Sequence, residues 1–282
     1  MPSLALSPGV ELFYRIDDYT DPWTEPQTVL CLHGLAESGE AWRGWVPHLA
    51  RRWRVVRPDL RGFGASTPMP AGFDWSVDVP VEDVARLARE LGLTRFHLVS
   101  CKFGGTVAMR FAARYPELVE TLSVVSAPVS LQESLGSQIP GWARLLETGG
   151  VRGWAAETMA NRLGSAVPAE AARWWTDLMG RTADSTVAGI FRTLAQVDIR
   201  DDLPRIQCPT LIVTTTGSGL GPVDYMRSWQ RRIPDSRLEV IDSDSYHVAA
   251  AMPDHCARAV AAFIAGQEDA QAAPAHSPER SV

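Results

Sequence analysis

The sequence predicts an α/β fold in which a mostly parallel sheet is flanked by helices and carries a helical cap. Short apolar runs rich in β-branched residues alternate with longer helical patterns, as in parallel sheets covered by helices. The stretch 130–196 has no strand pattern and is rich in Ala, Leu and Trp. Strand patterning returns after it, so we expect the helical stretch to be an insertion within one domain rather than a separate unit.

The individual elements follow from local patterns. Residues 81–91 predict an amphipathic helix, because Val81, Val84, Leu87 and Leu91 recur at helical spacing on one face. Short apolar runs bounded by turn residues predict the strands. The expected strands are 28–33, 53–57, 95–100, 122–126, 210–215 and 238–242, and the expected helices outside the cap are 81–91, 103–115 and 256–265.

These elements give a predicted division of the chain into a core interrupted by the cap. The core occupies residues 1–129 and 197–266, and the cap occupies 130–196. The last segment, 267–282, lacks large apolar side chains and is predicted to be a disordered tail.

Composition narrows the possible partners. The chain has 282 residues, 45% of them hydrophobic and 21% charged, with a formal net charge of −6, which argues against nucleic acid or an anionic membrane as a partner. Its four cysteines are scattered without a CxxC pair, which favours free thiols in the cytoplasm over disulfides or a metal site. We expect no signal peptide, membrane helix, metal or cofactor. The oligomeric state stays open.

Lys102 is the most unusual residue, because the other 26 of the 27 basic residues are arginines. It stands in the segment Val99-Ser100-Cys101-Lys102-Phe103-Gly104-Gly105, between an apolar strand pattern and a helical pattern. This is the strand–turn–helix context of the G-x-S-x-G motif, in which a sharp turn exposes a nucleophilic serine. In that register Lys102 takes the position of the nucleophile.

The chain resembles the α/β-hydrolase superfamily over roughly residues 8–266. The resemblance rests on landmarks in the family's order: the turn His33-Gly34, the loop from Asp59 to Ser66 with Gly62 and Gly64, the elbow at Lys102, and His247 near the C-terminus. It implies that His247 is the catalytic histidine. It also implies that the backbone N–H groups of Leu35 and Phe103 form an oxyanion hole.

The acid of the usual Ser-His-Asp triad is missing from its expected places. The loop after the strand 210–215 contains no Asp or Glu, and Ser218 falls about where the acid would be. The other family position, after 122–126, is also without a carboxylate. Asp224 is the nearest candidate, and whether it or any other carboxylate orients His247 stays open. This pattern predicts a site different from a standard serine hydrolase.

The lysine changes the chemistry that we expect. A lysine that attacked an ester would form a stable amide, whereas a neutral lysine forms imines with ketones and aldehydes. We therefore predict a hydrolase or lyase that cleaves a small, fairly apolar carbonyl compound without a cofactor, with Lys102 and His247 as the catalytic pair. Two routes stay open: retro-aldol cleavage or decarboxylation through an imine, and non-covalent hydrolysis beside a protonated Lys102. The alternative is an inactive scaffold that binds a small ligand or partner.

Overall fold

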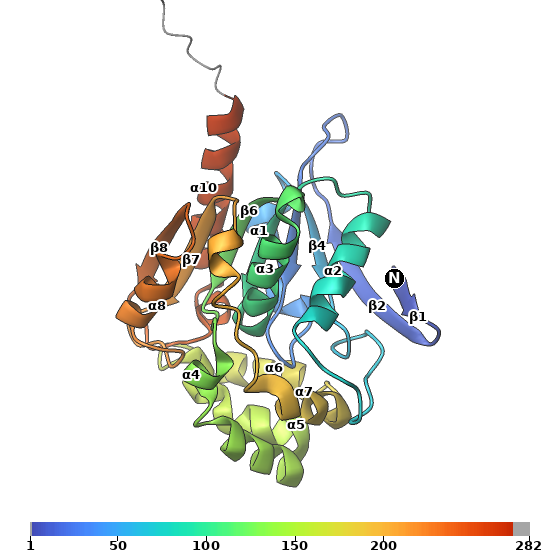
Figure 1. Cartoon of the computed structure of the whole chain (residues 1–282), viewed down its shortest axis with the longest axis vertical. Helices are drawn as coiled ribbons and strands as arrows, with labels where there is room; N and C mark the ends of the chain where they lie inside the picture. The colour runs from blue at the N-terminus through green and yellow to red at the C-terminus, as the bar shows by residue number, and fades with distance from the viewer. Residues whose placement is uncertain (1, 273–282) are drawn as a thin grey trace, which may run out of the picture.

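The computed structural model describes residues 2–272 and contains one sheet, which runs through the centre of the molecule (Figure 1). Its strand order is β1-β2-β4-β3-β5-β6-β7-β8, and the strands from β4 to β8 in this order are parallel. The strands are β1 (Ser3–Ser7), β2 (Val10–Asp17), β3 (Thr28–Leu32), β4 (Arg54–Pro58), β5 (Phe96–Cys101), β6 (Val119–Val125), β7 (Thr210–Thr215) and β8 (Ser236–Ile241).

The N-terminal hairpin is an element that we did not predict. β1 pairs antiparallel with β2, and β2 pairs antiparallel with β4. Gly9 makes the turn between them with φ of 75°, a left-handed conformation that glycine adopts at little cost. The hairpin therefore extends the parallel part of the sheet by two antiparallel strands.

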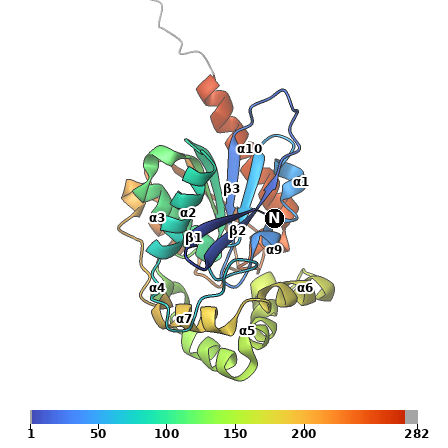
Figure 2. The ribbon, with the colours of Figure 1, turned by 90° about the vertical axis from the view of Figure 1, so that its right-hand side faces the viewer.

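Helices cover both faces of the sheet (Figure 2), and the predicted fold class is confirmed. The helices α2 and α3 lie against one face, and α1, α9 and α10 lie against the other. The core helices and short 3₁₀ turns are η1 (Gly39–Trp42), α1 (Val46–Leu49), α2 (Asp78–Glu90), α3 (Lys102–Arg114), η2 (Pro116–Leu118), η3 (Leu203–Arg205), α8 (Val223–Gln230), α9 (Val248–Ala251) and α10 (Pro253–Ala272).

Four helices between β6 and β7 form a layer at the carboxyl ends of the parallel strands (Figures 1 and 2). They are α4 (Leu131–Leu135), α5 (Ile139–Leu163), α6 (Ala169–Met179) and α7 (Asp184–Leu194). The long helix α5 is interrupted at Gly150, which has φ of 63°. The Asp184 side chain accepts a hydrogen bond from the Val151 N–H at 2.8 Å and so caps the second half of α5.

The final helix extends further than we predicted. α10 continues to Ala272, so residues 267–272 are helical and the prediction of a disordered tail from 267 was wrong for them. The Glu268 carboxylate accepts hydrogen bonds from Trp53 Nε1 and from Arg52 Nη2, each at 2.7 Å. These contacts fix the last turns of α10 to the core without large apolar residues. Positions 273–282 of the predicted tail lie outside the described residues.

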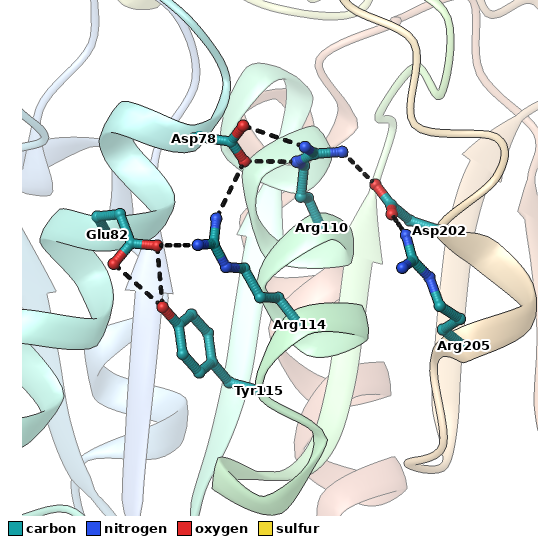
Figure 3. A network of polar contacts seen from close by, with 7 residues as sticks. All are labelled: Asp78, Glu82, Arg110, Arg114, Tyr115, Asp202 and Arg205. Carbon is teal, nitrogen blue, oxygen red and sulfur yellow. Dashed lines mark hydrogen bonds and ion pairs between the residues drawn. The ribbon is translucent and has the colours of Figure 1, made fainter.

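A network of charged side chains joins α2, α3 and the segment before β7 (Figure 3). The Asp78 carboxylate on α2 accepts hydrogen bonds from Arg110 on α3, at 2.7 and 3.1 Å. Arg110 also donates to Asp202 at 2.9 Å, and Asp202 pairs with Arg205. The network holds the helix that follows the elbow in place from its solvent side.

No helix within residues 2–272 is long and apolar enough to cross a membrane.

Candidate active site

The chain makes a strained turn at Lys102, between β5 and α3. Lys102 has φ of 51°, in the left-handed region that non-glycine residues rarely adopt. Two glycines allow the close packing that this turn requires: a Cβ on Gly104 would lie 2.4 Å from the carbonyl oxygens of Leu32 and His33, and one on Gly105 would lie 2.3 Å from the Ala127 Cβ. Backbone strain of this kind is maintained at functional sites by the surrounding structure.

The turn after β3 is held by His33. Its Nδ1 lies 2.7 Å from the Gly34 carbonyl oxygen, so it carries the proton and donates, and its Nε2 then accepts a hydrogen bond from the Leu60 N–H at 2.9 Å. Within residues 2–272, no hydrogen bond engages the N–H of Leu35 or that of Phe103. The two residues lie on the wall of one cavity together with Lys102. Both N–H groups are therefore free to form the oxyanion hole that the resemblance implies, and this role stays a prediction.

Glu37 is the residue that the sequence reasoning missed. Its carboxylate is fully buried and accepts a hydrogen bond from Lys102 Nζ at 2.9 Å through Oε1 and one from the Gly34 N–H at 3.0 Å through Oε2. The same Oε1 lies 2.9 Å from His247 Nε2. The lone lysine and the predicted catalytic histidine are therefore brought together by a carboxylate between them.

His247 is buried at the start of α9. Its Nε2 is at ion-pair distance from Glu37, but it is not aligned for a straight hydrogen bond, and its Nδ1 has no partner within the described residues. The Trp175 ring of the cap packs against the imidazole, with centroids 4.9 Å apart. The backbone N–H of His247 donates to the Arg162 carbonyl oxygen at 2.9 Å, which ties the histidine to the cap.

Neither Ser218 nor Asp224 takes the place of the triad acid in the structure. Ser218 Oγ accepts a hydrogen bond from the Leu220 N–H at 3.2 Å, which is a local turn contact. The Asp224 side chain is exposed and pairs with Arg227 at 3.5 Å in the first turn of α8. Neither residue contacts His247. The carboxylate beside the histidine is that of Glu37, and it faces Nε2, whereas Nδ1 has no partner among the described residues.

Burial and charge set the protonation states at this site. Burial lowers the pKa of His247 to about 4, so the imidazole is neutral at pH 7. Burial opposes the ionisation of Glu37, but in the acid range, where His247 is protonated, the charges of His247 and Lys102 outweigh it and hold the pKa of this carboxyl well below its usual range. Burial also lowers the pKa of Lys102, and Glu37 resists this change. Lys102 is therefore closer to losing its proton than an ordinary lysine is.

The cavity between the cap and the sheet is small. It measures about 30 Å³ when traced by the centre of a water-sized sphere, which is enough for water but not for a substrate. Side chains of the core and of the cap both form its wall, and most of them are apolar. The lining residues are Leu35, Lys102, Phe103, Pro128, Leu131, Leu135, Trp142, Trp154, Arg162, Leu194, Leu220 and Tyr246.

No cluster of three or more His, Cys, Asp or Glu side chains suitable for a metal ion occurs in the part of the chain that the structure describes.

The profile of the α/β hydrolase fold family matches residues 27–251, so the chain belongs to this family. The chain is similar to a pimeloyl-[acyl-carrier protein] methyl ester esterase of Aeromonas hydrophila, with 31% identity over 78% of this chain and 88% of the relative. It is also similar to RutD of Klebsiella pneumoniae, whose name is "putative carbamate hydrolase RutD", with 28% identity over 79% of this chain and 86% of the relative. Relatives with these names support an enzyme of the superfamily.

Solved structures agree with the family assignment at the level of the fold. A hydrolase from Pseudomonas aeruginosa superposes with a TM-score of 0.82 at 24% identity and covers 93% of this chain and 97% of the other. An esterase from Thermogutta terrifontis gives a TM-score of 0.81 at 22% identity, with coverages of 94% and 97%.

Proposed function

We propose that this protein is a cofactor-independent enzyme that cleaves a small, fairly apolar carbonyl compound through an imine at Lys102. One observation supports the proposal most strongly: Glu37 Oε1 lies 2.9 Å from Lys102 Nζ and 2.9 Å from His247 Nε2. A carboxylate in this position can accept a proton from the lysine and pass it on. The lysine therefore has the neighbours that imine chemistry needs.

Imine formation requires two protons to move from the lysine nitrogen to the carbonyl oxygen. Once the ammonium has given one proton to Glu37, the electron pair of the Lys102 nitrogen attacks the carbonyl carbon, and the π electrons of the carbonyl move to its oxygen. Of the three protons of the ammonium, one stays on the nitrogen of the iminium and two leave with that oxygen as water. Both must travel from nitrogen to oxygen. Glu37, in hydrogen-bond contact with the nitrogen, is placed for this transfer.

The Leu35 and Phe103 N–H groups would stabilise the alkoxide that forms during the attack. The bond between the α and β carbons of the iminium then breaks, and its electron pair moves to the iminium. If the β carbon is that of a carboxylate, carbon dioxide leaves, and if it bears a hydroxyl, an aldehyde leaves. His247 is neutral at pH 7, and it can remove the proton of a β-hydroxyl or exchange protons with Glu37. Protonation of the enamine carbon and addition of water to the iminium release the ketone and restore Lys102.

A second candidate is a catalytically inactive scaffold, and the cavity volume of about 30 Å³ favours it. In this case the Lys102–Glu37 pair is a buried structural salt bridge that replaces the nucleophile of an ancestral enzyme. Such a protein would bind a ligand or partner without turnover. An active enzyme, in contrast, requires side chains of the cap to move before a substrate enters.

Replacement of the lysine by two different side chains distinguishes these possibilities. Lys102→Arg keeps a cation at the elbow but forms no stable imine, and Lys102→Met removes the charge. Turnover of β-keto acids and β-hydroxyketones by the wild-type protein, abolished in both variants, is the expected result. Retention of turnover in Lys102→Arg would favour non-covalent hydrolysis beside a cation. Absence of turnover in all three proteins, with equal ligand binding, would favour the scaffold.

A further inference from the structure

Arg162 is a second buried cation at the cavity and has no part in the mechanism above. It lies in α5 of the cap, and only 2% of its surface is exposed. Its Nε donates to Thr158 Oγ1 at 2.9 Å, and its Nη2 is buried without any hydrogen-bond partner among the described residues. A buried charge that is neither paired nor fully hydrogen-bonded lowers the stability of the fold, and a bound anion would offset this cost.

Aromatic rings hold the Arg162 guanidinium in a fixed place. Its Cζ lies 4.7 Å from the Trp154 ring centroid, 5.6 Å from that of Trp142 and 5.9 Å from that of Tyr246. The faces of such rings attract a cation but leave the edge of its N–H groups free for a hydrogen-bond acceptor. The guanidinium is therefore held ready for a partner that the protein itself does not supply.

The charges around the cavity leave one positive charge uncompensated. Glu37 is the carboxylate that pairs with Lys102, and within residues 2–272 no carboxylate pairs with Arg162. His247 adds no charge at pH 7 because its pKa is about 4. A ligand that carries one negative charge would balance the cavity.

The two cations border the same space. Lys102 and Arg162 both line the cavity, and Lys102 Nζ lies 5.8 Å from the centroid of the Tyr246 ring, which Arg162 also contacts. Apolar side chains such as Leu131 and Leu194 line the same cavity. A short carbon chain with an anionic group at one end and a carbonyl group at the other matches this arrangement of charges, once side chains of the cap move to admit it.

We infer that Arg162 binds the carboxylate of the substrate, so that the substrate class is a small keto acid with one negative charge. The guanidinium receives the carboxylate through its free Nη2, and the carbonyl group points to Lys102. This inference rests on the proposed function for the carbonyl end of the ligand. The binding of the acid end depends on Arg162 alone.

The test compares an acid with its neutral ester. The probes are 4-oxopentanoate and its methyl ester, and binding is followed by the intrinsic tryptophan fluorescence at pH 7, to which Trp142 and Trp154 beside Arg162 contribute. We expect the wild-type protein to bind the acid at least tenfold more tightly than the ester. Arg162→Gln should remove this preference, and Arg162→Lys should restore part of it. Equal affinity of the wild-type protein for acid and ester, or no saturable binding of the acid, overturns the inference.

The double variant Lys102→Met/Glu37→Gln separates this inference from the proposed function, because it forms no imine. It removes both members of the Lys102–Glu37 ion pair, so the charge of Arg162 stays uncompensated. Preference for the acid in this variant supports the role of Arg162 even if no imine is ever found. Loss of the preference in the double variant, with Arg162 intact, would contradict the inference. If Arg162→Gln does not fold, the comparison of acid and ester on the wild-type protein and on the double variant still decides the question.

Discussion

At the scale of single residues, Glu37 is the group on which the proposed chemistry depends. It is 2.9 Å from the only lysine of the chain, and it is fully buried. Sequence reasoning found Lys102, His247, Leu35 and Phe103 because each stands in a local motif. It missed Glu37 because the contacts of this residue are with side chains 65 and 210 positions away. A search for a carboxylate partner of the lone lysine, within the turn 33–38, could have identified it.

Glu37→Gln should reduce turnover and the rate of imine formation by about 10²–10⁴-fold, the usual contribution of a general acid–base group. The amide keeps the shape of the side chain and can still bond the Gly34 N–H if its oxygen takes that side, but it cannot accept a proton from Lys102. Glu40→Gln is the matched control, because Glu40 lies three residues further on, in η1, and pairs with Arg15 instead of Lys102. Turnover of Glu37→Gln equal to that of the control would contradict the role of Glu37.

The lowered pKa of His247 leads to a prediction of how the stability of the fold depends on pH. Its folded-state pKa of about 4 lies below its ordinary value of 6.5, so the unfolded chain binds a proton more readily. Stability is therefore lost as the pH falls from 6.5 to about 4, by an amount on the order of 3 kcal/mol. Urea unfolding of His247→Gln should show a weaker decrease over this range. An unchanged pH dependence in the variant would show that the histidine is not held neutral.

At the scale of elements, the interruption of α5 at Gly150 shapes the cap. A Cβ on Gly150 would lie 2.9 Å from the Asp184 carboxylate, and its φ of 63° is costly for other residues. Gly150→Ala should lower the stability by about 1–3 kcal/mol. Gly149→Ala is the control: a Cβ there has no atom within 4 Å, so the change should stabilise the helix by up to about 1 kcal/mol. Equal effects of the two substitutions would contradict the account of the kink.

The charged network of Figure 3 joins α2 to α3. The Asp202 carboxylate is buried and forms an ion pair with Arg110, whereas the Asp78 side chain is partly exposed. Asp202→Asn should therefore cost about 1–3 kcal/mol and Asp78→Asn about 1 kcal/mol or less, the latter decreasing further in high salt. Asp224→Asn, at an exposed side chain, is the control with no expected effect. Urea unfolding at low and high salt measures the free energy of unfolding of all three variants. An Asp202→Asn variant as stable as the wild-type protein would show that the network does not stabilise the fold.

At the scale of the whole molecule, the alternation of strands and helices was sufficient to predict the fold class, because each element buries a face that its own pattern reveals. The N-terminal hairpin and the last turns of α10 were not predicted. The hairpin depends on pairing with β4, and the end of α10 depends on the contact of Glu268 with Trp53. The charge balance of the cavity could not be predicted either, since Arg162 reaches it only when the cap packs on the core.

Borohydride trapping tests the central claim most directly, namely that Lys102 is an amine that forms an imine. The wild-type protein is incubated at pH 7 with a panel of keto acids and hydroxyketones, reduced with borohydride, and analysed by peptide mass. Since Lys102 is the only lysine of the sequence, its peptide is distinguished by mass from an adduct on the N-terminal amine. We expect a reduced adduct on the Lys102 peptide that is absent in Lys102→Arg. Turnover of a substrate without an adduct on that peptide would contradict the account.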